Sequence, residues 1–217
     1  MTEGLHGQDG GGQAERFWEE HYCRREQVWS GRPNPVLVEV AGTLPAGTAL
    51  DLGCGEGGDA VWLAGLGWRV TAVDVSATAL GRATIAAASA GVEDNIDFRR
   101  HDLARAFPTG TFDLVSAQYL QSPLEFPRDR VLRAAARAVA PGGLLLIVEH
   151  GPVRHRASKA HSHVLSPEPE ETLATLDLIP GRWRAERLGS PERRATGPNR
   201  QPVTATDNVV AVRRLIR

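Results

Sequence analysis

Residues 49–59 read Ala-Leu-Asp-Leu-Gly-Cys-Gly-Glu-Gly-Gly-Asp, an apolar segment that passes through one acidic residue into a glycine-rich turn. Gly53, Gly55 and Gly58 fit the pattern GxGxxG. Such glycines allow a tight turn from a strand into a helix, and they let a ligand approach the backbone closely. Because several enzyme classes share this pattern, the surrounding residues must decide which ligand it serves.

Strand-like and helix-like segments alternate around this turn. The expected strands are 48–52, 69–75, 96–100, 112–119 and 144–149, and the expected helices are 57–66, 76–90 and 132–139. Apolar strands that alternate with helices predict a parallel sheet covered on both faces. Two later segments, 182–187 and 207–215, are expected to pair as a hairpin at the sheet edge. We therefore predict a Rossmann-like α/β fold with a seven-stranded, mostly parallel sheet and an antiparallel edge strand.

The domain organisation follows from the same reading. Residues 1–13 contain three consecutive glycines and few apolar side chains, which predicts a disordered tail. Residues 14–217 are expected to form a single domain. In it, residues 14–44 would form a helical lid, with a second helix over 35–44, and residues 45–150 would form the ligand-binding core. The remainder, 151–217, would supply the sheet edge and an acceptor-side loop.

Composition excludes several classes of partner. The chain has 217 residues, is 41% hydrophobic, and has a formal net charge of −1, so it offers no bulk attraction to nucleic acid or to an anionic membrane. No apolar run approaches the roughly 20 residues that span a bilayer, and no secretory leader is evident. Two cysteines give no disulfide framework, which favours the cytoplasm. We expect a monomer or a homodimer.

Acidic residues follow two further strands. Asp74 lies 21 residues after Gly53 at the end of the second expected strand, where a carboxylate can accept hydrogen bonds from ribose hydroxyls. Its alternative role is a helix cap, although Ser76 is better placed for that. Asp102 ends the third expected strand and could accept from an adenine amine while the Leu103 backbone meets the ring edge. Its alternative role is to cap the following turn.

Five motifs stand in order along the core: Asp51-x-Gly53-x-Gly55, Asp74, His101-Asp102, Phe112-Asp113-Leu114-Val115 and Pro141-Gly142-Gly143. With these motifs the chain resembles the class I S-adenosylmethionine-dependent methyltransferases over roughly residues 45–150. The upstream segments Phe17–Tyr22 and Trp29–Asn34 are also similar to small bacterial methyltransferases of the tellurite-resistance and thiopurine type.

The resemblance implies S-adenosylmethionine as the cofactor and S-adenosylhomocysteine as the product. Gly53 and Gly55 would admit its amino-acid portion, and Asp51 would support the ammonium group. The other cofactor-binding residues that the resemblance implies are Cys54 beneath the cofactor, Asp74 at the ribose, Val75 on the adenine face, Asp102 and Leu103 at the adenine edge, and Gln118 beyond the fourth strand. Cys54 stands near a helix N-terminus, which could lower the pKa of its thiol.

The expected lid contributes aromatic side chains and one arginine. Trp18, Tyr22 and Trp29 have faces suited to a sulfonium, and Arg32 suits the cofactor carboxylate. For the aromatic residues the alternative is simple packing between a helix and the sheet.

The expected reaction is an in-line methyl transfer to a nucleophilic oxygen, nitrogen, sulfur or heavier chalcogen of a small-molecule acceptor. His150, at the end of the fifth expected strand, is the candidate base or substrate residue, with Tyr22 as a second catalytic candidate. Tyr119 and His163 are further substrate-binding candidates. The histidines at positions 150, 155, 161 and 163 have no obvious carboxylate or cysteine partner, so we predict no metal site.

Two alternatives remain open at this point. An NAD(P)-dependent oxidoreductase would share the glycine pattern, but a carboxylate at Asp51 would repel a pyrophosphate. A noncatalytic protein that only binds S-adenosylmethionine would share every cofactor-binding residue. Measured methyl transfer would exclude it.

Overall fold

The computed structural model describes residues 10–151, 167–196 and 201–216, and these lie in two compact units, Met1–Thr109 and Gly110–Arg217. The division between the units falls inside the expected core, between the third and fourth strands. The loop histidines His155, His161 and His163 lie outside the described residues. Each unit is described by itself below.

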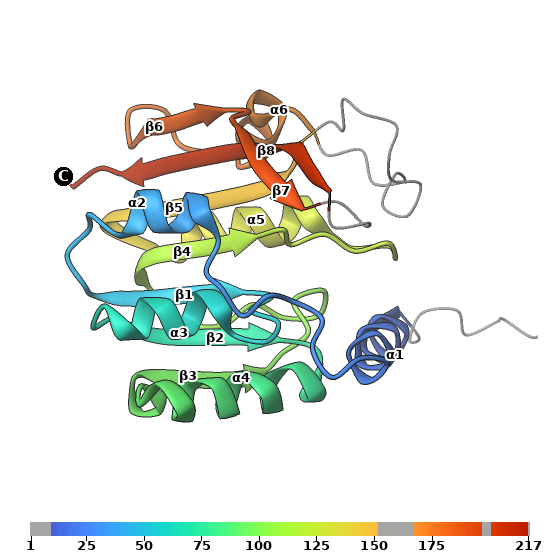
Figure 1. The fold of residues 1–217 in the computed structure, drawn as a ribbon. Coiled ribbons are helices and arrows are strands. Elements are labelled where there is room, and N and C mark those ends of the chain that lie inside the picture. The colour runs from blue at the N-terminus through green and yellow to red at the C-terminus, as the bar shows by residue number, and fades with distance from the viewer. Residues whose placement is uncertain (1–9, 152–166, 197–200, 217) are drawn as a thin grey trace, which may run out of the picture. The chain divides into compact units, whose positions relative to one another are not determined.

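The first unit carries three parallel strands in the order β3-β2-β1. Its elements are α1 (Gly10–Cys23), α2 (Pro35–Ala41), β1 (Thr48–Leu52), α3 (Gly58–Gly65), β2 (Arg69–Asp74), α4 (Ala77–Ala90), a 3-10 turn (Glu93–Asn95) and β3 (Ile96–Arg100). Helices α3 and α4 contact each other and the strands, as Figure 1 shows. Leu50, Leu52 and Val73 are fully buried in the core of this unit.

Most boundaries of the first unit agree with the sequence prediction. Strands β1 and β3 have the expected bounds, and Ser76 caps α4 by accepting a hydrogen bond from the Ala79 N–H at 3.1 Å. The prediction was wrong for residues 10–13, which begin α1 instead of extending the tail. Extending an existing helix adds one hydrogen bond for each residue that is fixed, so low-propensity glycines can join its first turn. Helix α2 also ends earlier than expected, at Ala41.

The second unit combines parallel and antiparallel strands in the order β4-β5-β8-β6. Its elements are β4 (Phe112–Gln118), α5 (Arg128–Arg137), β5 (Val139–His150), α6 (Pro169–Thr175), β6 (Trp183–Gly189), β7 (Glu192–Thr196) and β8 (Pro202–Arg214). Strand β4 is parallel to β5, whereas β8 is antiparallel to both β5 and β6. The predicted antiparallel edge hairpin is therefore confirmed as β6 and β8.

Two features of the second unit differ from the prediction. Strand β5 begins at Val139 and runs through Pro141-Gly142-Gly143, which the sequence suggested would be a turn. The β4–β5 register shifts between Phe112 and Leu114, and Gly142 has a φ of +84°, so these glycines form an irregularity within the strand. The prediction also missed β7, which lies in the Gly- and Pro-rich stretch and pairs with β8.

The α/β fold class is confirmed, and the described residues contain eight strands where seven were expected. Among the described helices, none has both the length and the apolar character that a membrane span requires.

Candidate functional site

The glycine turn of the first unit is anchored on one carbonyl of the neighbouring strand. The N–H groups of Gly53 and Cys54 both donate to the Val73 oxygen, at 2.9 and 3.0 Å. Gly53, Gly55 and Gly57 have φ values of +71°, +53° and +83°, a region that favours glycine. The turn is therefore built from glycines in the left-handed region, which a residue with a Cβ atom adopts unfavourably.

Gly58, the third glycine of the GxGxxG pattern, has another function. A Cβ atom added there would stand 3.0 Å from the Arg32 oxygen and 3.2 Å from the Gly31 carbonyl carbon. The bare glycine thus lets the N-terminal segment pass against the start of α3. The sequence pattern alone gave no sign of this role.

Asp51 is the most unusual group of the site. Its residue is 2% exposed, and its Oδ2 atom has no hydrogen-bond partner among the described residues. Burial raises the pKa of Asp51 well above its ordinary value, and the charges of Asp59 and Asp74 raise it further. A buried carboxylate oxygen without a partner is costly, so this position suits a ligand that supplies a cationic donor.

Asp74 lies at the end of β2 beside the same turn. Its Oδ2 accepts from the Gly55 N–H and its Oδ1 from the Ser76 N–H, each at 2.9 Å. Burial raises the pKa of Asp74, although these backbone hydrogen bonds partly oppose the effect. An ionised carboxylate has about four acceptor positions, so acceptor capacity remains for a ligand's hydroxyl group after the backbone bonds from Gly55, Val75 and Ser76. The capping role falls to Ser76, as expected.

Asp59 completes a group of three carboxyls around the turn. Burial raises the pKa of Asp59 to about 6, opposed by a hydrogen bond from the Asn34 N–H at 2.6 Å. A carboxyl whose pKa is higher in the folded state binds its proton more tightly there, so the ligand-free protein gains stability as the pH falls through this window.

We accordingly expect Asp59 to raise the unfolding temperature of the ligand-free protein as the pH falls from 7 to 5. In the variant Asp59→Asn that contribution should disappear, because nothing at this position titrates. Thermal unfolding of both proteins across the pH range measures the difference. The exposed Asp94→Asn serves as the control and should follow the wild type. Parallel pH profiles for wild type and Asp59→Asn would contradict the assignment.

Two of the expected lid residues meet the glycine turn directly. The Trp29 Nε1–H donates to the Tyr22 hydroxyl at 3.0 Å. A Cβ atom on Gly55 would lie 2.9 Å from that hydroxyl and 3.4 Å from the Trp29 ring. Tyr22 is buried, and its pKa is raised by burial and by Asp74, whereas Trp29 is 52% exposed. The aromatic pair Tyr22 and Trp29 therefore lies against the turn.

The other lid candidates are placed less directly. The Trp18 ring lies 6.4 Å from the Tyr22 ring, centre to centre, with an interplanar angle of 38°. Arg32 is exposed, and only its backbone N–H has a described local bond, to the Ser30 hydroxyl at 3.3 Å. Sequence reasoning missed Glu56 and Arg82, whose side chains form hydrogen bonds with the backbone of residues 22–29. The only signal in the sequence is that Glu56 is an acidic residue inside the glycine turn.

Asp102 takes up the alternative role that the sequence left open. Its Oδ1 accepts from the Ala104 N–H at 2.9 Å, and its Oδ2 pairs with Arg105 at 3.4 Å. It therefore caps the turn after β3, which still leaves acceptor positions free for a ligand. Leu103 is buried and Val75 is half-buried. An adenine-edge role for Asp102 stays a prediction.

Cys54 has the opposite character to the one suggested by its place near a helix N-terminus. Burial raises the pKa of its thiol well above the ordinary value, and the charges of Asp51 and Asp74 add to the effect. The lowering that the helix N-terminus would allow is not found, because burial and the neighbouring carboxyls outweigh the helix end.

In the second unit, the ends of β4 and β5 bring the acceptor-side candidates together. The Tyr119 ring stacks on the His150 ring at 4.3 Å with an interplanar angle of 22°. The Tyr119 hydroxyl donates to the buried Asp207 at 3.0 Å, and Arg193 bonds to both, at 2.5 Å to Asp207 and 3.2 Å to Tyr119. Tyr119 also has a φ of +50°, which is rare outside glycine and frequent at functional positions.

Gln118 precedes this cluster on β4. Its Nε2 donates to the Ser116 hydroxyl at 2.9 Å, while its buried Oε1 has no hydrogen-bond partner among the described residues. An amide oxygen in that state is suited to a donor on a ligand.

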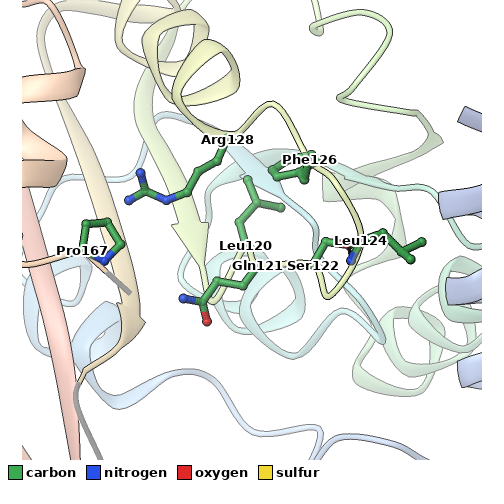
Figure 2. A pocket seen from close by; sticks show the side chains of 7 residues that line it. All are labelled: Leu120, Gln121, Ser122, Leu124, Phe126, Arg128 and Pro167. Atoms are coloured by element: carbon green, nitrogen blue, oxygen red, sulfur yellow. Dashed lines mark hydrogen bonds between the residues drawn. The ribbon is translucent and has the colours of Figure 1, made fainter. Parts of the chain in front are cut away.

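A small pocket of about 130 Å³ lies beside the loop that follows β4 (Figure 2). It is lined by Leu120, Gln121, Ser122, Leu124, Phe126, Arg128 and Pro167. Arg128 is already paired with the buried Glu149 and the Thr172 hydroxyl, so its charge is compensated. Ligand pockets usually measure roughly 300–1,000 Å³, so this one is too small to hold a cofactor by itself. In the described part of the chain, no group of three or more His, Cys, Asp or Glu side chains could hold a metal ion.

Known proteins place this arrangement in context. Residues 49–143 match the family described as "Methyltransferase domain". A ubiquinone biosynthesis O-methyltransferase of Burkholderia cenocepacia is 33% identical over 113 residues, which are 51% of this chain and 48% of that enzyme. The chain thus aligns with about half the length of this relative.

Solved structures agree over nearly the whole chain. A structure described by the conversion of a disulfide bond into a thioacetal group during echinomycin biosynthesis is 26% identical, with a TM-score of 0.69 and 93% coverage of both chains. The N-methyltransferase NodS from Bradyrhizobium japonicum WM9, in complex with S-adenosyl-L-homocysteine, is 18% identical, with a TM-score of 0.66 and coverage of 93% of this chain and 98% of that chain. At 18% identity, the likeness to NodS shows only that the two chains share a fold.

Proposed function

We propose that the chain is a class I S-adenosylmethionine-dependent methyltransferase, which transfers a methyl group to a nucleophilic oxygen, nitrogen, sulfur or heavier chalcogen of a small-molecule acceptor. The observation that carries this proposal is Asp51, a buried carboxylate with an oxygen that has no described partner, beside a turn of left-handed glycines. S-adenosylmethionine brings an ammonium group and a sulfonium, both cationic. A pyrophosphate-containing dinucleotide would bring negative charge instead, so the oxidoreductase alternative is not favoured.

The first unit would hold the cofactor. Asp51 would accept from its ammonium group, while Gly53 and Gly55 would give its amino-acid portion access to the backbone. Asp74 would use its remaining acceptor positions for the ribose hydroxyls. The other proposed contacts are Val75, Asp102 and Leu103 at adenine, Trp18, Tyr22 and Trp29 as the aromatic cover, Arg32 at the carboxylate, Cys54 beneath the ligand, and Gln118.

When bound, the cofactor supplies a methyl group that its sulfonium already activates. The protein's own residues then have to orient the acceptor, exclude water and receive a proton where the acceptor carries one. We assign proton removal to His150 and acceptor contact to Tyr119, with His163 as a further acceptor-side candidate. The stacked rings and the Asp207–Arg193 pair support this assignment because they fix the Tyr119 hydroxyl.

We expect His150→Ala to lower turnover about tenfold near pH 7, less than a general base usually contributes because the methyl group is already activated. The loss should shrink at higher pH, where the acceptor ionises by itself. His150→Phe keeps a ring stacked on Tyr119 and removes the proton acceptor, so it should behave like His150→Ala. Full turnover in His150→Phe would show that only the stack matters.

The proposal is tested in two steps. Calorimetry with S-adenosylhomocysteine should detect binding to the wild-type protein. A screen with tritiated methyl donor against oxygen, nitrogen and sulfur nucleophiles should then find transfer to a small acceptor. Binding without transfer to any acceptor would favour the noncatalytic alternative, and absence of binding would overturn the proposal.

The cellular setting completes the proposal. We place the protein in the cytoplasm as a monomer or a homodimer that acts without nucleic acid or membrane partners. Its two free cysteines and its near-neutral charge support this placement.

A further inference from the structure

A partly buried ion pair joins the glycine turn to helix α4. Arg82 Nη1 lies 2.7 Å from Glu56 Oε1, and the two side chains are 25% and 6% exposed. Neither residue belongs to the expected cofactor-binding set. Burying a charged pair costs free energy unless further hydrogen bonds replace the lost hydration. The other hydrogen-bond partners of Glu56 and Arg82 therefore show which part of the chain the pair holds.

Those partners all lie on the N-terminal segment 22–29. The Glu56 carboxylate accepts from the Val28 N–H at 3.1 Å and from the Trp29 N–H at 2.8 Å. Arg82 Nη2 donates to the Tyr22 and Arg25 carbonyl oxygens, at 3.0 and 2.6 Å. The ion pair therefore holds both ends of this segment through its backbone.

The segment's two ends carry the aromatic pair Tyr22 and Trp29. Their side chains are joined at 3.0 Å and lie against Gly55 of the turn. Further along, Asp59 accepts from the Asn34 N–H, and Gly58 admits the backbone of Gly31 and Arg32. These contacts with the backbone of residues 22–34 come from the glycine turn and from helices α3 and α4.

We propose that Glu56 and Arg82 are positioning residues that hold the aromatic pair over the glycine turn and slow the release of the bound cofactor. This inference rests on the proposed function, since it assumes that the turn binds S-adenosylmethionine. The side chains act through the segment's backbone and make no contact with the reacting atoms. Loss of the ion pair should therefore free the segment while leaving Asp51 and Asp74 in place.

The test compares Arg82→Ala and Glu56→Gln with the wild-type protein, using S-adenosylhomocysteine as the probe. Stopped-flow displacement should show dissociation about tenfold faster in Arg82→Ala, with little change in the association rate. Glu56→Gln keeps one acceptor oxygen for the backbone N–H groups but loses the charge and the second acceptor, so its dissociation should be intermediate. Amide hydrogen exchange at Val28 and Trp29 should accelerate in both variants. A general loss of stability would instead accelerate exchange throughout the protein.

Arg24→Ala is the matched control, because Arg24 lies in the same segment and pairs with the exposed Glu20 at 3.3 Å, away from the turn. It should release the probe at the wild-type rate. If the wild-type protein does not bind the probe, the proposed function fails. Suppose instead that the wild type binds the probe, and that Arg82→Ala and Glu56→Gln both release it at the wild-type rate. The inference alone is then overturned. Should Arg82→Ala not fold, Glu56→Gln decides between these outcomes.

Discussion

Asp51→Asn should weaken binding of S-adenosylhomocysteine by about 10- to 100-fold, because a hydrogen bond to a charged group contributes about 1.5–3 kcal/mol. The substitution keeps the volume and shape of the side chain and removes the charge that would meet the ligand's ammonium group. Asp51 is 2% exposed, so solvent cannot replace the lost partner. Calorimetric titration near pH 8, where the wild-type carboxylate is most ionised, gives the largest contrast.

The same variant should change stability in the opposite direction. Burial raises the pKa of Asp51, so the folded wild type resists ionisation of this group and loses stability as the pH rises. Asparagine does not titrate, and the unfolding temperature of Asp51→Asn relative to wild type should therefore increase from pH 5 to pH 8. A variant that binds poorly yet gains relative stability cannot be explained by unfolding. Asp94→Asn, an exposed change in the same unit, should alter neither quantity, and unimpaired binding by Asp51→Asn would refute the assigned role.

The first unit shows how far local patterns determine structure. Strands β1 and β3 and the Ser76 cap follow from apolar runs and from one hydroxyl that precedes a helix, and all three are confirmed. Such elements are specified by neighbours in the sequence. The Glu56–Arg82 pair is a different case, because its members stand 26 residues apart. Both side chains also form hydrogen bonds with backbone groups of a third segment, residues 22–29. No spacing rule predicts that contact.

The second unit shows where sequence patterns mislead. Pro141-Gly142-Gly143 has the composition of a turn, yet the pairing partners on either side keep the chain extended, and the glycines absorb the irregularity. Strand β7 lies in a stretch that composition assigns to a loop, but Arg193 on it bonds to the buried Asp207 of β8. The Tyr119 cluster depends on this pairing. Tertiary context here overrides local propensity.

Gly55→Ala should reduce affinity for S-adenosylhomocysteine by about 10- to 100-fold and destabilise the protein by about 1–2 kcal/mol. The stability cost comes from a φ of +53°, which an L-residue with a Cβ adopts unfavourably. The loss of affinity has a separate cause. The new methyl group would stand 2.9 Å from the Tyr22 hydroxyl and 3.4 Å from the Trp29 ring, in the space between the turn and the aromatic pair.

Gly91→Ala separates these two effects. Gly91 has a φ of +66° at the end of α4 in the same unit, but a Cβ atom added there would meet nothing within 4 Å. It should therefore show the backbone cost of about 1 kcal/mol and bind the ligand with wild-type affinity. Calorimetry and thermal unfolding of the two variants measure both quantities side by side. Equal affinity in Gly55→Ala and Gly91→Ala would mean that the ligand does not approach the turn at Gly55, and the position of the cofactor would then have to be sought elsewhere in the first unit.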